Sequence, residues 1–101
     1  MSVLLAAPLL VAALAANPIN AACEFEGFAL QGRVKEVTSF PDIRVQIVTS
    51  FADIRVQRVT SFADACGRWR FVDSFPDFTI QYVESFPDIR VEYVTSFPGL
   101  R

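Results

Sequence analysis

Histidine is absent from all 101 residues of this chain. This absence removes the commonest general base, the commonest metal ligand and the usual partner of a serine or cysteine nucleophile. An excess of positive charge is also lacking, because nine Lys and Arg stand against eleven Asp and Glu, a net charge of -2. Sequence-independent binding to the phosphates of nucleic acid is therefore not expected. We expect a non-enzymatic protein without a metal, a cofactor or a nucleic-acid partner.

Charge is missing altogether from the N-terminal part of the chain, where the first charged residue is Glu24 and residues 3–16 are apolar apart from Pro8. This run fits the apolar region of a signal peptide better than a membrane-spanning helix, which needs about 20 apolar residues. We expect residues 1–22 to be a signal peptide or leader, and residues 23–101 to form one secreted or periplasmic domain. No Lys or Arg precedes the run, so a retained N-terminal anchor is the alternative.

Cysteine is scarce, with only Cys23 and Cys66 present. In a small exported domain, two cysteines are expected to form a disulfide. Such a bridge would stabilise the fold by on the order of 3 to 4 kcal/mol in the loop-entropy account. Because Cys23 follows Ala21 and Ala22, a lipid anchor on the Cys23 thiol is the alternative, although Asn20 stands where lipoprotein signals have an aliphatic residue.

The remainder of the chain is built from six copies of one phrase, V-x-S-F-[PA]-D, the last ending in Gly. The copies are Val37–Asp42, Val48–Asp53, Val59–Asp64, Val72–Asp77, Val83–Asp88 and Val94–Gly99, and their phenylalanines are spaced 11, 11, 13, 11 and 11 residues apart. Segments between copies, such as Ile43–Gln46, alternate apolar and polar residues as half-buried strands do. Pro or Ala followed by Asp is typical of turns, and the prolines disfavour helix. We predict an all-β domain.

The odd repeat length constrains how the units stack. Side chains alternate with period two, so an eleven-residue unit must contain a break in phase. The Pro-Asp turn is one break, and a second is expected near Ile47 and its equivalents, whose varied residue types indicate exposed positions.

The charges of the repeats indicate how the units stack. Direct stacking of consecutive units would place Arg44 against Arg55, whereas two units per coil place Arg55 beside Thr79. We expect a compact two-layer β-solenoid of 11-residue repeats with Ile, Val and Phe inside.

The chain resembles the bacterial septoil-knot family over residues 23–101. The resemblance rests on these repeats, on the central Ala65–Phe75 segment (A-C-G-R-W-R-F-V-D-S-F) and on the closing Ser96–Gly99. The resemblance implies a small all-β domain whose chain winds twice around itself into a seven-crossing knot. The function of that family is not known, so the resemblance implies a fold and no activity.

Several repeated residues invite a chemical interpretation. The repeated Asp residues are expected to be turn residues rather than a calcium ladder, because the glycine-rich pattern of calcium-binding rolls is missing. The repeated threonines suggest an ice-binding array, which Asp73 and Glu84 interrupt. The repeated serines lack a general base and are expected to pack beside Phe. The aspartates are Asp42, Asp53, Asp64, Asp77 and Asp88, the threonines Thr38, Thr49, Thr60 and Thr95, and the serines Ser39, Ser50, Ser61, Ser74, Ser85 and Ser96.

The best candidate for a recognition patch is Arg68-Trp69-Arg70, an aromatic residue flanked by cations. The favoured interpretation, however, is that Trp69, the only Trp, fills the core in the space made by the longer central unit. The other arginines are expected on a mixed, solvated surface: Arg44, Arg55, Arg58 and Arg90.

Three functions follow from these features. A rigid, monomeric, non-enzymatic scaffold is expected first. A binding module for an envelope component or glycan, acting through Arg68, Trp69 and Arg70, is the second. A subunit of an extracellular fibre, built by strands that template further strands, is the third.

Overall fold

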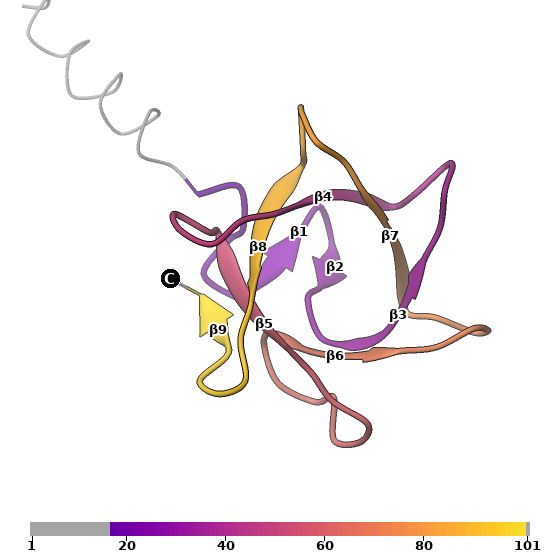
Figure 1. Ribbon diagram of the computed structural model, residues 1–101. Coiled ribbons are helices and arrows are strands. Elements are labelled where there is room, and N and C mark those ends of the chain that lie inside the picture. The colour runs from indigo at the N-terminus through magenta and orange to yellow at the C-terminus, as the bar shows by residue number, and fades with distance from the viewer. Residues whose placement is uncertain (1–16, 101) are drawn as a thin grey trace, which may run out of the picture.

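The computed structural model of the protein describes residues 17–100, which form strands and turns and no helix (Figure 1). The all-β prediction is therefore confirmed. In that part of the chain, nothing meets the length and hydropathy required of a transmembrane helix. The strands are β1 (Glu24–Phe25), β2 (Phe28–Ala29), β3 (Gly32–Glu36), β4 (Ile43–Ile47), β5 (Ile54–Arg58), β6 (Arg68–Phe71), β7 (Phe78–Tyr82), β8 (Ile89–Tyr93) and β9 (Gly99–Leu100).

Strands β3 to β8 form a closed parallel barrel, and the expected two-layer solenoid is wrong. The order around the ring is β6-β3-β7-β4-β8-β5, and β5 pairs with β6 to close it. The chain passes around the barrel twice. The first pass forms β3, β4 and β5, and the second pass forms β6, β7 and β8, which lie between the strands of the first pass. Consecutive units are therefore mostly not neighbours, and the strands surround one core (Figure 1).

The register shows how the two passes interlace. Ile47, at the end of β4, and Ile54, at the start of β5, both pair with Val91 of β8. The connection over residues 48–53 therefore crosses β8. The same relation places residues 37–42 over β7, 72–77 over β3 and 83–88 over β4. We call these connections arches, together with the longer 59–67 and the final 94–98.

An arch explains why an odd repeat length works. Crossing one strand means bridging two inter-strand spacings, about 10 Å. Six residues span up to about 20 Å, so the surplus bows outward. Each unit is a five-residue strand and a six-residue arch, as in β4 and residues 48–53, and the inward face is reset in the arch.

The interlacing keeps Arg44 and Arg55 apart, although Arg33 and Arg70 are register partners on β3 and β6. Arg44 and Arg55 lie on β4 and β5, with β8 between them, which confirms that they are not neighbours. The partner of Arg55 is Glu92, with Nε 3.8 Å from Oε1, rather than Thr79. Thr79 instead pairs with Lys35, because β7 lies between β3 and β4.

The core fills the barrel with the alternate residues of each strand. Trp69 is fully buried, its ring lies 5.5 Å from that of Phe78, and its Nε1 donates a hydrogen bond of 3.0 Å to the carbonyl of Leu30. The aliphatic core residues of the strands are Val34, Ile43, Val45, Ile54, Val56, Ile80, Ile89 and Val91. Within the described residues, no buried side-chain polar atom lacks a hydrogen-bond partner.

The N-terminal segment closes the end of the barrel at which the strands begin. Cys23 and Cys66 form the predicted disulfide, which occupies the sulfur that a lipid anchor would need. Ile19 is only 5% exposed and belongs to the core, and Asn17 Nδ2 donates a hydrogen bond to the carbonyl of Asp53. Residues upstream of the expected boundary at residue 23 thus contact the barrel and its core. The rest of the expected leader lies outside the described residues.

Candidate functional site

The opposite end of the barrel is formed by the last residue of each of the six strands. We call these side chains the mouth residues: Glu36, Ile47, Arg58, Phe71, Tyr82 and Tyr93. Phe71, Tyr82 and Tyr93 pack against the core from this end, while Ile47 is 53% exposed. Ile47 and its equivalents in the later units were predicted to be exposed or partly exposed, and the structure confirms this for Ile47, Arg58, Phe71, Tyr82 and Tyr93.

Arg58 is held at the centre of the mouth by three aromatic side chains. Its Cζ lies 4.5 Å from the centroid of the Phe71 ring and 4.6 Å from that of Tyr93. Its Nη2 donates a hydrogen bond of 3.2 Å to the hydroxyl of Tyr82, which lies 2.6 Å from the hydroxyl of Tyr93. Cation–π contacts of this kind fix the plane of a guanidinium. The cluster joins β5, β6, β7 and β8.

Tyr93 is the most perturbed acid in the cluster. Burial raises the pKa of Tyr93 far above its ordinary value of 10.0, and the hydrogen bond with Tyr82 raises it further. The phenol therefore stays protonated at physiological pH. Tyr93 can donate or accept a hydrogen bond here, but it does not serve as a base.

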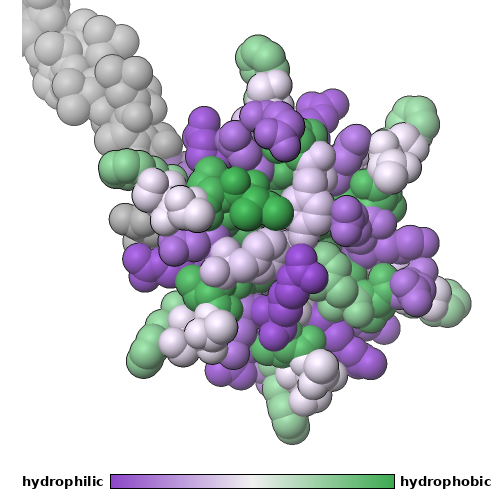
Figure 2. Space-filling model, viewed as in Figure 1, coloured by the Kyte–Doolittle hydropathy of each residue, from purple (hydrophilic) through white to green (hydrophobic). Residues whose placement is uncertain are grey.

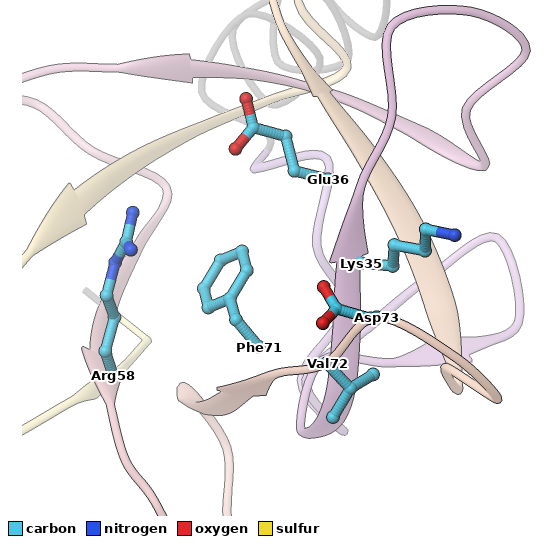
Figure 3. A pocket seen from close by; sticks show the side chains of 6 residues that line it. All are labelled: Lys35, Glu36, Arg58, Phe71, Val72 and Asp73. Carbon is cyan, nitrogen blue, oxygen red and sulfur yellow. The ribbon is translucent and has the colours of Figure 1, made fainter.

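Two hollows flank Arg58. The first, about 370 Å³, is lined by Lys35, Glu36, Arg58, Phe71, Val72 and Asp73. Figure 3 shows Arg58, Phe71 and Glu36 reaching from different strands toward one space. The second, about 360 Å³, is lined by Gln57, Arg58, Tyr93, Val94 and Thr95. Both hollows thus share one cation.

A second surface feature is the set of phenylalanines of the repeats, which we call the Phe tips. They are 77–97% exposed and have φ between 52° and 58°. Figure 2 shows apolar groups projecting around the periphery, with hydrophilic surface between them. The expectation that these side chains lie inside is wrong, because each occupies an outward-bowed arch. The Phe tips are Phe40, Phe51, Phe62, Phe75, Phe86 and Phe97.

Hydrogen bonds fasten the ends of the arches. Asp88 Oδ2 accepts a hydrogen bond of 2.8 Å from the backbone N–H of Arg44, and the Asp88 N–H donates to the carbonyl of the same residue. Gln46 Nε2 donates to the carbonyl of Glu84 at the other end of that arch. Asp53 and Asp77 form the same reciprocal pairs with Arg90 and Arg33, and Gln57 and Gln81 donate to Thr95 and Thr38.

These contacts show that Asp53, Asp77 and Asp88 bind the backbone of a neighbouring strand. The N–H of Arg33, helped by the guanidinium of the same residue, lowers the pKa of Asp77 against a smaller opposing effect of burial. Across residues 17–100, no three His, Cys, Asp or Glu side chains gather as a metal site would require. The aspartates that close the arches therefore anchor the Phe tips.

Other residues singled out in the sequence lie elsewhere. Trp69 lies in the core, as the favoured interpretation of this residue held, while Arg70 is exposed and Arg68 half-buried, so the three residues form no exposed patch. The repeated serines are all exposed, so their expected packing role is wrong. The repeated threonines fall on separate arches that point in different directions and form no flat array (Figure 1).

Arg58 had been grouped only with the surface arginines. The signal that could have identified it is divergence among the copies, since the mouth position varies most where the rest of the unit repeats.

Comparison with known proteins bears on the fold. Curated proteins gave no match to this chain. Residues 27–101 match the model of the 7(1) septoil knot domain, in agreement with the resemblance noted in the repeats. This match covers most of the chain, including all six strands of the barrel and all six Phe tips. The chain therefore belongs to the septoil knot domain family.

Proposed function

We propose that the protein is an exported, monomeric, non-enzymatic scaffold that attaches to lipid surfaces of the cell envelope through its Phe tips. The observation behind this proposal is that six exposed phenylalanines stand in a left-handed backbone conformation. That conformation costs an L-residue about 1 to 2 kcal/mol, and such strain clusters at functional sites. No core contact in the fold accounts for a large apolar side chain at these positions.

A lipid surface fits the chemistry of the Phe tips. Each tip follows Ser and precedes Pro or Ala, so the nearest side chains are small and uncharged. The tips point in different directions around the barrel (Figure 2), so the tips on any one side can meet a surface together. A bilayer accepts any orientation and requires no matching shape. Burying one Phe contributes about 2 kcal/mol, and neighbouring tips add to one another on a common surface.

Export is supported by the apolar leader and by the disulfide, which persists in oxidising compartments. Because Ile19 packs in the core, we place signal-peptide cleavage upstream of Asn17. Ala13-Leu14-Ala15 supplies small residues at the two positions that a signal peptidase reads. We also propose that the chain follows the seven-crossing knotted path of its family, which the arches over interlaced strands support.

The fibre alternative has less support. Strand-templated assembly needs a long free sheet edge, whereas β3 to β8 pair around a complete ring. In the described residues, the strand left at the sheet edge is β9, which is two residues long.

Co-sedimentation with neutral phosphatidylcholine vesicles tests the proposal. The purified protein is expected to bind them with little dependence on salt, because the tips carry no charge. Replacing all six tips by Ser is expected to abolish binding, whereas replacing them by Leu retains apolar area and is expected to retain it. Equal binding by the Ser variant, or no binding by the parent protein, contradicts the proposal.

A further inference from the structure

The mouth position is the strand position at which the six strands differ most. The residue two positions earlier is Val in β3, β4, β5 and β8, Ile in β7 and Trp in β6, whereas the mouth position holds Glu, Ile, Arg, Phe and Tyr. A ring of near-identical units builds a symmetric scaffold, and a specific binding site requires that symmetry to be broken. The mouth breaks it, with a single cation at Arg58 among three aromatic rings.

The guanidinium of Arg58 has more N–H donors than its contact with Tyr82 uses. It presents five N–H groups, of which one donates to Tyr82. The ion pairs among residues 17–100, Arg33–Asp77 and Arg55–Glu92, do not include it. The guanidinium lies over the rings of Phe71 and Tyr93, and Arg58 is still an exposed residue, so its other N–H groups can receive a ligand. A guanidinium fixed in this way loses little freedom when it binds a planar anion.

Charge distinguishes the two hollows. In the first hollow, the carboxylates of Glu36 and Asp73 offset the charges of Lys35 and Arg58, so it carries no net positive charge. The second contains no acidic residue, and Arg58 is its only charged side chain. Its walls combine the ring of Tyr93 and the side chain of Val94 with the polar Gln57 and Thr95. A volume of about 360 Å³ suits a small ligand.

We propose that the second hollow, bounded by Arg58, Tyr93 and Val94, binds a small organic carboxylate whose apolar body packs against Tyr93 while its carboxylate pairs with Arg58. Arg–carboxylate pairs are often bidentate, which adds direction to the attraction. The site is formed by the ends of β5 and β8 and the first two residues of the 94–98 arch, and it does not include the Phe tips. Ligand binding at this site is therefore tested independently of vesicle binding.

Benzoate and hexanoate are suitable probes, with benzamide and hexanamide as neutral controls of the same shape. Titration followed by NMR is expected to shift the backbone signals of Val94 and Thr95, with saturation in the millimolar range that one charge-assisted contact gives. The amides are expected to bind about tenfold more weakly, because they cannot pair with a cation.

Variants assign the effect to one residue. Arg58→Gln is expected to weaken benzoate binding about tenfold, to the level of benzamide. Arg44→Gln, which makes the same charge change at an exposed position on β4, is the matched control and is expected to bind as the parent does. Arg58→Lys keeps the charge without the planar fork and is expected to bind at an intermediate level.

Four results would overturn the proposal: no saturable shift with either carboxylate, equal binding of amide and carboxylate, unchanged binding in Arg58→Gln, or equal loss in Arg44→Gln. Thermal unfolding without ligand checks that Arg58→Gln is folded. If it is not, the decision rests on the amide comparison in the parent protein and on Arg58→Lys.

Discussion

Replacing all six Phe tips by Gly is expected to make the protein more stable. At each tip the backbone has φ between 52° and 58°, which costs an L-residue about 1 to 2 kcal/mol. Glycine adopts this conformation freely, but it loses about 0.5 to 1 kcal/mol in extra chain entropy on folding. The net gain is about 0.5 to 1 kcal/mol for each tip.

The six contributions should add, because the tips lie on separate arches and are exposed. The total is about 3 to 6 kcal/mol, which is large beside the 5 to 15 kcal/mol that holds a typical domain together. Urea denaturation followed by the fluorescence of Trp69, the single Trp, measures the change. Scans in both directions confirm that the transition is at equilibrium.

Phe78→Ala is the matched control, because Phe78 is 2% exposed and contacts Trp69. Loss of a core phenylalanine is expected to destabilise the fold by about 3 to 5 kcal/mol. If the six-Gly variant is less stable than the parent protein, the Phe tips have a structural role and the reasoning behind the proposed function is refuted.

Three further predictions concern the termini and the mouth. Replacing both cysteines by Ala is expected to lower the free energy of unfolding by about 4 kcal/mol, because the bridge closes a separation of 43 residues; an unchanged urea midpoint would contradict this. N-terminal sequencing of the exported protein is expected to find an end at or before Asn17, and a chain beginning at Cys23 is expected to unfold at lower temperature because it lacks Ile19. The pKa of Tyr93 is raised in the folded state, so stability is fully present below the unfolded value of 10.0 and declines as pH rises above it; Tyr93→Phe is expected to show a shallower decline above pH 10, and equal slopes would argue against burial of the phenol.

Local features of this fold could be predicted, and pairings between distant segments could not. Alternation in segments such as Ile43–Gln46 specifies a strand whatever its neighbour is. Near-identical units give no preference for which unit lies beside which, so β8 between β4 and β5 follows only from the closed ring. A solenoid and an interlaced barrel are both compatible with an 11-residue repeat and with this alternation.

The candidate sites were missed for related reasons. An apolar residue such as Phe40 is expected in the core, and nothing local reveals a left-handed conformation at the apex of an arch. For Trp69 the sequence allowed both a core position, which was favoured, and a surface patch, and alternation along β6 turns its ring inward. Arg58 acquires its role from Phe71, Tyr82 and Tyr93, which lie on three other strands.

The arches have a consequence for local opening of the structure. A strand such as β8 lies beneath residues 48–53, which belong to the other pass of the chain. It cannot separate from β4 and β5 unless that arch lifts, and lifting the arch strains the two strands that it joins. Partial opening, which exposes one strand at a time in most small domains, is suppressed here. Hydrogen exchange at the amides of β3, β4, β7 and β8 should therefore proceed at similar rates, set by opening of the whole barrel.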